Sequence, residues 1–137
     1  MTTLPYVELD HTADLCLRAT GDDLPALFAH AAQGLFALLR CRAGVHPQAV
    51  SRSIALESGD QESLLVDWLN ELLYVAERHG ECYDGFSIAL PDNQHLEAVA
   101  MGWSDQRAGR CIKAATFFGL NIVQTAAGYE ATITFDV

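Results

Sequence analysis

The chain has 137 residues, of which 50% are hydrophobic and 19% are charged, so it can form one compact core and is too apolar to be disordered. Eight Lys and Arg residues stand against eighteen Asp and Glu residues, which gives a formal net charge of -10. This charge argues against direct nucleic-acid binding, because contacts to phosphates depend on basic residues. We therefore expect a single domain over residues 1–137, with cations or basic protein surfaces as its partners.

The sequence contains no recognisable leader or membrane-spanning stretch. The first residues lack a charged start followed by an apolar run, and the longest apolar stretches are interrupted by charge. We therefore expect a cytoplasmic protein that does not contact a membrane. The four cysteines form no C-x-x-C pair, which argues against a zinc site and favours buried, reduced thiols: Cys16, Cys41, Cys82 and Cys111.

The first half of the chain alternates between predicted strands and helices. Short strands are expected at residues 6–10 and 15–19, and Gly21-Asp22-Asp23 then offers a helix N-cap. Apolar residues recur at three- and four-residue spacing from Leu24 to Leu39, which predicts an amphipathic helix. Alternation between apolar and polar side chains predicts a strand at residues 50–57.

A second amphipathic helix is expected at residues 61–79, between the N-cap candidate Asp60 and the terminating Gly80. Its polar residues, Asn70 among them, are expected to face water.

The last part of the chain is predicted to be mostly β. The strands at residues 86–90 and 96–101 flank a turn signal and should pair as a hairpin. Further strands are expected at residues 111–123 and 129–137, separated by a turn at residues 126–128. The chain is therefore predicted to have an α+β fold, in which two amphipathic helices pack on one face of a mostly antiparallel sheet.

Residues 8–14 gather the side chains that favour metal binding. This segment contains three carboxylates, an imidazole at His11 and a hydroxyl, and Asp14 stands directly before a predicted strand. Hard cations such as calcium prefer oxygen ligands of this kind. The alternative is that Asp10 and Asp14 only cap turns, as Asp residues often do.

Two further candidates lie near the C-terminus. Asp136 and the α-carboxylate of Val137 are anions one residue apart, and they repel each other unless a cation lies between them. The alternative is an ordinary solvated chain end. Lys113 stands in an otherwise apolar strand, where it either faces solvent at a sheet edge or pairs with a nearby carboxylate. There is no phosphate loop, zinc-protease motif or nucleophile elbow.

Four segments, in order, make the chain resemble the archease family. They are the turn His11-Thr12-Ala13-Asp14, the helical stretch 64–73 (LLVDWLNELL), the strand 112–116 (IKAAT) and the closing Phe135-Asp136-Val137. The resemblance extends from about residue 6 to residue 137. One departure is Phe117-Phe118, where many members have an aromatic residue followed by histidine, so a proton carrier or nitrogen ligand is lost at that point.

The resemblance implies a non-enzymatic accessory factor for an RtcB-type RNA ligase. Members of the family are held to promote guanylylation of that ligase and its multiple turnover in tRNA splicing or RNA repair. The family's divalent-metal site, attributed to calcium, corresponds by motif to Asp14, Asp136 and Val137. We expect His11 and Lys113, which were selected from the sequence itself, as supporting residues.

Two other functions stay open at this point. An autonomous metal-dependent hydrolase would use the carboxylates beside His11, but no nucleophile and base pair is evident in the sequence. A chaperone-like binding module would need a sizeable exposed apolar patch.

Overall fold

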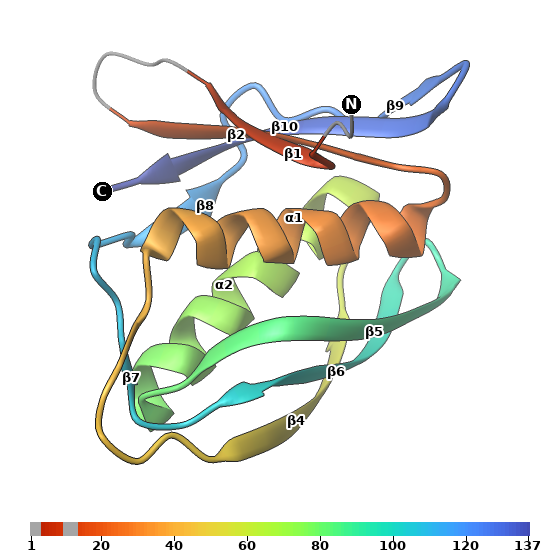
Figure 1. Cartoon of the computed structure of the whole chain (residues 1–137). Coiled ribbons are helices and arrows are strands. Elements are labelled where there is room, and N and C mark those ends of the chain that lie inside the picture. Colours follow the sequence, from red (N-terminus) through yellow and green to blue (C-terminus); the bar gives the residue numbers. More distant parts are fainter. Residues whose placement is uncertain (1–3, 10–13) are drawn as a thin grey trace.

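The computed structural model describes residues 4–9 and 14–137, in which two helices lie between two antiparallel sheets (Figure 1). The helices are α1 (Leu24–Leu39) and α2 (Gln61–His79). The strands are β1 (Tyr6–Leu9), β2 (Leu15–Gly21), β3 (Arg42–Ala43), β4 (Ala49–Glu57), β5 (Cys82–Asp92), β6 (His95–Trp103), β7 (Gln106–Arg107), β8 (Ala114–Thr116), β9 (Val123–Thr125) and β10 (Gly128–Asp136).

The α+β class, the antiparallel pairing and the packing of both helices against a sheet face are confirmed, but the strands form more than one sheet, whereas the sequence predicted one. The larger sheet has the order β1-β2-β10-β8, with β9 also paired to β10, and a second sheet has the order β4-β6-β5. The short strands β3 and β7 form a separate two-stranded sheet. The sequence of α1 explains the difference. Its buried residues occupy most of its circumference, so one sheet cannot cover them: Leu27, Phe28, Ala31, Ala32, Gly34, Leu35, Phe36, Leu38 and Leu39.

Both helices begin at the predicted N-caps. The Asp23 side chain accepts a hydrogen bond from the Ala26 N–H, and the Asp60 side chain accepts one from the Ser63 N–H, each at 2.8 Å. The bond from Ser63 also holds the pKa of Asp60 below its ordinary value. Gly80 ends α2 in the left-handed conformation, with φ of 65°, as a glycine at this position allows. Neither helix has the length and apolar character that crossing a bilayer requires, as far as the described residues go.

The predicted long strand at residues 111–123 is wrong. Only β8 and β9 form there, and Gly119 between them has φ of 64°, which breaks an extended run. Phe117 and Phe118 precede this break and are exposed, at 56% and 74%. The predicted turn before the last strand is confirmed, because Gly128 pairs with Thr125 across it.

The expectation of four reduced thiols is also wrong. Cys41, directly after α1, and Cys82, at the start of β5, form a disulfide between residues 41 positions apart. Cys16 is free and buried, and Cys111 is free and exposed. No spacing rule connects two cysteines this far apart in sequence, so the pairing depends on the tertiary fold.

A buried acid joins the end of α2 to the second sheet. The guanidinium of Arg52 donates two hydrogen bonds to Glu81, at 2.9 and 2.7 Å, and the Tyr83 hydroxyl donates a third at 2.7 Å. Glu81 is only 4% exposed. The bonds from Arg52 outweigh burial and hold the pKa of Glu81 below its ordinary value, whereas burial raises the pKa of Tyr83 and keeps its hydroxyl a donor.

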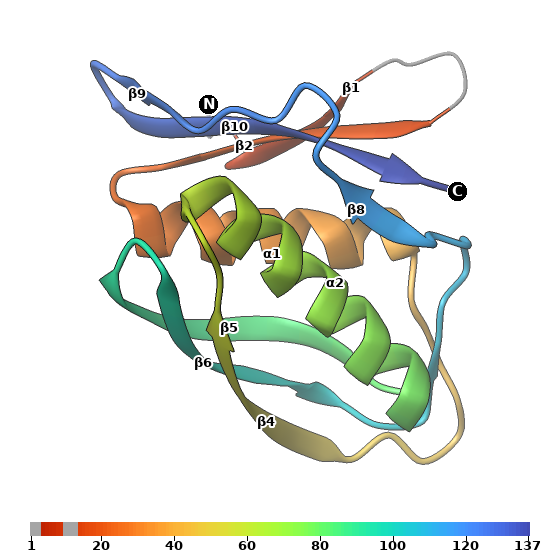
Figure 2. The ribbon, with the colours of Figure 1, turned by 180° about the vertical axis from the view of Figure 1, so that it is seen from behind.

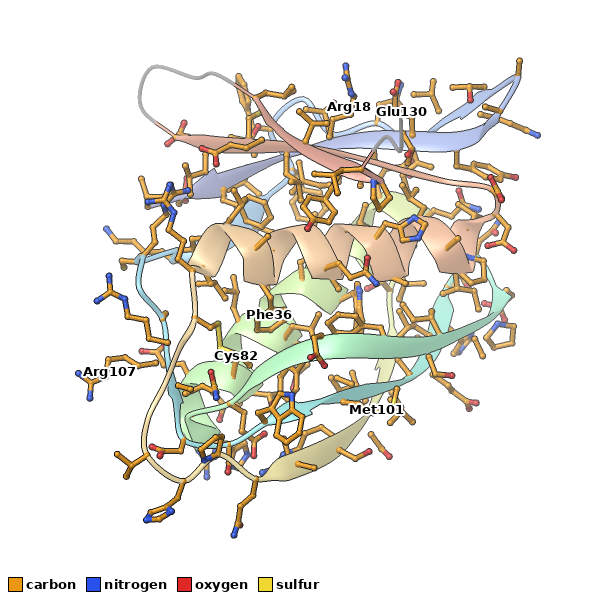
Figure 3. The ribbon with its side chains drawn as sticks, in the orientation of Figure 1. Arg18, Phe36, Cys82, Met101, Arg107 and Glu130 are labelled. Carbon is orange, nitrogen blue, oxygen red and sulfur yellow. A yellow bond between two sulfur atoms is a disulfide. The ribbon has the colours of Figure 1, made fainter. Side chains whose placement is uncertain are left out.

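We predict that Glu81→Gln lowers the free energy of unfolding by about 2 kcal/mol at neutral pH, because it removes the charge that strengthens these hydrogen bonds. Urea denaturation measures the change. The control is Glu130→Gln, which breaks the exposed pair with Arg18 (Figure 3), 3.8 Å apart, and should have little effect.

The difference in unfolding free energy between wild type and Glu81→Gln should also depend on pH. Because the pKa of Glu81 is lowered in the folded protein, its stabilisation is fully present above the ordinary pKa of 4.5 and is lost as the pH falls through the folded value. The difference between wild type and Glu81→Gln should therefore shrink below pH 4.5. A difference that stays constant on acidification would contradict the assignment.

Candidate functional site

The pairing of β2 with β10 brings two of the predicted metal ligands to the same edge of the larger sheet. The last register pair is Phe135 with Leu15. Asp14 directly precedes Leu15 and Asp136 directly follows Phe135, so both aspartates lie at the same end of the paired strands. Figures 1 and 2 agree that the C-terminal end of β10 lies next to the start of β2 and beside β8.

β8 adds Lys113 to this edge from the other side of β10. Asp136 pairs with Ala114 in the sheet register, and the Lys113 N–H donates a 2.8 Å hydrogen bond to the carbonyl oxygen of Asp136. The Lys113 side chain is exposed. Its ammonium group is therefore available to solvent or to a partner at the end of the chain.

Asp14, Asp136 and Val137 thus flank the last register pair at this end of β2 and β10, and we call these three residues the acidic edge. Asp14 is half-buried, Asp136 is exposed, and Val137 is 45% exposed. His11 lies outside the described residues. Asp14 and Asp136 supply carboxylate oxygens and no nitrogen or sulfur, a donor set that suits a hard divalent cation.

The acidic edge contains fewer than three acidic side chains and needs the α-carboxylate of Val137 to complete it. Within residues 4–9 and 14–137, no three His, Cys, Asp or Glu side chains gather in a way that could hold a metal ion. A cation at this edge would therefore depend on the two aspartates together with the main-chain carboxylate.

Arg110 is a neighbouring charge that the sequence did not indicate. Its Nη1 atom lies 3.6 Å from the Oε2 atom of Glu8, on β1. The same Nη1 atom is buried and has no hydrogen-bond partner among the residues that the structure describes. Glu8, one of the three carboxylates of the predicted segment, is therefore paired with a cation, and Arg110 links the chain before β8 to the strand that precedes Asp14.

Asn70 fixes β8 to α2, contrary to the expectation that it faces water. The Ala115 N–H donates a 2.7 Å hydrogen bond to the Asn70 Oδ1 atom, and the Asn70 Nδ2 atom donates one of 3.2 Å to the Ala115 carbonyl oxygen. Figure 2 shows α2 and β8 on the same side of the molecule. One helical side chain therefore satisfies both backbone groups of a strand residue next to the acidic edge.

We predict that Asn70→Ala lowers the free energy of unfolding by about 1–3 kcal/mol, because it leaves both backbone groups of Ala115 without a partner. Hydrogen exchange at the Ala115 amide should accelerate in the same variant. Asn70→Asp keeps the acceptor but loses the donor, so its effect should be smaller at this amide. Glu77→Ala, on the exposed face of α2, is the control, and equal exchange rates in all variants would contradict this role of Asn70.

Comparison with known proteins supports the resemblance over almost the whole chain. Residues 6–137 match the model of the Archease protein family. The chain is 34% identical to protein archease of Methanosarcina barkeri, over 96% of this chain and 95% of that protein. It is 33% identical to protein archease of Saccharolobus islandicus, over 93% of this chain and 95% of that protein.

Solved structures agree with the fold. The solution structure of Methanobacterium thermoautotrophicum protein 1598 superposes with a TM-score of 0.71 at 27% identity, over 98% of this chain and 100% of that one. A crystal structure from Thermotoga maritima, described as an archease and possible chaperone, gives a TM-score of 0.65 at 16% identity over 94% of each chain, a likeness of fold alone. The family match and the curated relatives together show that this chain belongs to the archease family.

Proposed function

We propose that this protein is an accessory factor for an RtcB-type RNA ligase, which it helps to become guanylylated and to turn over repeatedly in tRNA splicing or RNA repair. The observation that supports the proposal is the pairing of Leu15 with Phe135, which puts Asp14 and Asp136 at the same end of two neighbouring strands in a chain of the archease family. Both residues belong to the segments on which the resemblance to that family rests.

The acidic edge is proposed to bind a divalent cation, with calcium as the expected ion. Asp14 and Asp136 would supply side-chain oxygens, and Val137 would supply its α-carboxylate. A bound cation would offset the repulsion among these anions and stiffen the edge. His11 and Lys113 would support the site, Lys113 through its backbone bond to Asp136.

The partner is proposed to dock at this edge. Lys113 and the carboxylates present charges of both signs within a few residues of the exposed Phe117 and Phe118. An exposed combination of charges and aromatic side chains suits a protein surface better than a small substrate. The net charge of -10 makes direct RNA binding unfavourable, so the RNA would be held by the ligase.

Binding of unfolded proteins is a second candidate function. The description of the Thermotoga maritima structure as a possible chaperone supports it, and so do the exposed Phe117 and Phe118. Suppression of aggregation of several unrelated unfolded clients would favour this function over a dedicated ligase partner. Phosphoester turnover by the pure protein would instead favour the hydrolase considered from the sequence, whereas the accessory factor should have none.

We predict that Asp14→Asn and Asp136→Asn each weaken calcium binding by about tenfold or more, because each removes a charged oxygen ligand and keeps the side-chain shape. Both should reduce ligase guanylylation over several turnovers. Calorimetry with calcium and a guanylylation assay with the host's ligase are the two measurements. Asp84→Asn, an exposed aspartate on β5 of the other sheet, is the matched control and should behave as wild type.

The contribution of Val137 is tested by appending one glycine to the chain. The added residue moves the α-carboxylate by about 3.3 Å, the rise of one strand residue, and should weaken calcium binding without unfolding the sheet. If both Asn variants fold, bind calcium and stimulate the ligase as well as wild type, the acidic edge has no part in the function.

A further inference from the structure

The disulfide between Cys41 and Cys82 is reachable from two sides. Both sulfur-bearing residues are half-buried and line a cavity of about 540 Å³, together with Arg40. Cys82 also lines a second cavity of about 450 Å³, together with Arg107. Figure 3 shows Cys82 and its disulfide below the C-terminal end of α1. A small thiol can therefore approach this disulfide, which a fully buried one would not allow.

The same disulfide ties together the two backbone stretches that hold residues 106–113, which we call the linking segment. The Gln106 N–H donates a 2.8 Å hydrogen bond to the Gly80 carbonyl oxygen, two residues before Cys82. The Gly109 N–H donates to the carbonyl oxygens of Leu39 and Arg40, at 2.8 and 3.1 Å, immediately before Cys41. The linking segment is thus hydrogen-bonded to backbone one or two residues before each cysteine of the disulfide.

The fit between the linking segment and the end of α1 is close. A Cβ atom at Gly109 would lie 2.5 Å from the Arg40 carbonyl oxygen, a distance that real Cβ atoms do not reach. The Arg110 N–H also donates to the Leu39 carbonyl oxygen, at 3.0 Å. The disulfide joins the residue directly after this packed stretch to the start of β5.

The far end of the linking segment reaches the acidic edge. Arg110 approaches Glu8 of β1 at 3.6 Å, and the Lys113 N–H is bonded to the Asp136 carbonyl oxygen at 2.8 Å. Only residues 107–112 therefore separate the backbone bond at Gln106 from the backbone bond at Lys113. Loosening at one end is transmitted to the other through a short stretch of chain.

We propose that the Cys41–Cys82 disulfide is a thiol-exchange site, opened by a small dithiol, whose reduction releases the linking segment and loosens Arg110 and Lys113 beside the acidic edge. That this loosening regulates the acidic edge rests on the function proposed above. The exchange reaction and the loosening do not depend on it.

The reaction balances with the dithiol as reductant. One thiolate of the dithiol attacks a sulfur of the disulfide, a mixed disulfide forms, and the other cysteine leaves as a thiolate and takes up a proton. The second thiolate of the dithiol then attacks its own mixed disulfide, which closes a cyclic disulfide and releases the second cysteine thiolate to be protonated. Two electrons pass to the protein.

Amide hydrogen exchange on the full chain tests the proposal, before and after treatment with dithiothreitol, with mass spectrometry to confirm uptake of two hydrogens. The amides of Gln106, Gly109, Arg110 and Lys113 should exchange about tenfold faster or more after reduction. The amides of Ala26 and Ser63, bonded only to the helix N-caps, should change less than twofold. A Cys41→Ser, Cys82→Ser double variant should exchange like the reduced protein and ignore dithiothreitol.

Three results would overturn the proposal. They are a disulfide that resists dithiothreitol in the folded protein, unchanged exchange in the linking segment after confirmed reduction, and a response that disappears in Cys111→Ser, since that would assign the exchange to a different pairing. If the double variant does not fold, the reduced wild type gives the same readout. Ligase stimulation is measured separately, so its absence in a protein whose linking segment does loosen rejects the proposed function and leaves the thiol exchange standing.

Discussion

The antiparallel pairing of β2 with β10 is the constraint on which both the larger sheet and the acidic edge depend. Three pairs in this register, Ala19 with Ala131, Leu17 with Ile133 and Leu15 with Phe135, direct apolar side chains into the core. Leu17, Ile133 and Phe135 are each fully buried. A slip of one residue would turn all of these side chains to the opposite face, so burial of the core fixes the register.

The free energy gained by burying the apolar side chains of this register is larger than the repulsion expected between two carboxylates near its end. Burial of one large apolar side chain contributes about 1.5–3 kcal/mol. Repulsion between two unit charges 4 Å apart in water costs only about 1 kcal/mol. The core therefore dictates the register that puts Asp14 and Asp136 at the same end of the two strands, and a bound cation would relieve any repulsion between them.

Much of the fold follows from local pattern. The periodicity of α1 and α2, the caps at Asp23 and Asp60, and the alternation in β10 are properties of neighbouring residues, and the sequence predicted them. The division into two sheets, the Cys41–Cys82 disulfide and the contact between Asn70 and Ala115 join residues that are distant in sequence. No local spacing encodes them, so they emerged only from the structure.

Some residues of the candidate site could likewise be predicted from the sequence, and others could not. Asp14, Asp136 and Val137 were selected from their chemistry and from the archease resemblance, and the register explains how the two aspartates come together. Arg110 was missed because an arginine in a polar loop carries no signal of the strand it will approach. Its contact with Glu8 joins two residues that are far apart in the sequence.

Titration with manganese(II), observed by NMR, tests whether the two ends of the chain share one cation. A paramagnetic ion broadens the signals of nearby amides, and calcium should reverse the broadening if both ions occupy the same oxygen ligands. The account predicts saturable broadening that is strongest at Leu15, Phe135, Asp136 and Lys113 and is removed by calcium. Broadening centred on another acidic group, such as Glu57 and Asp92 around His95 in the other sheet, or no saturable broadening, would contradict it.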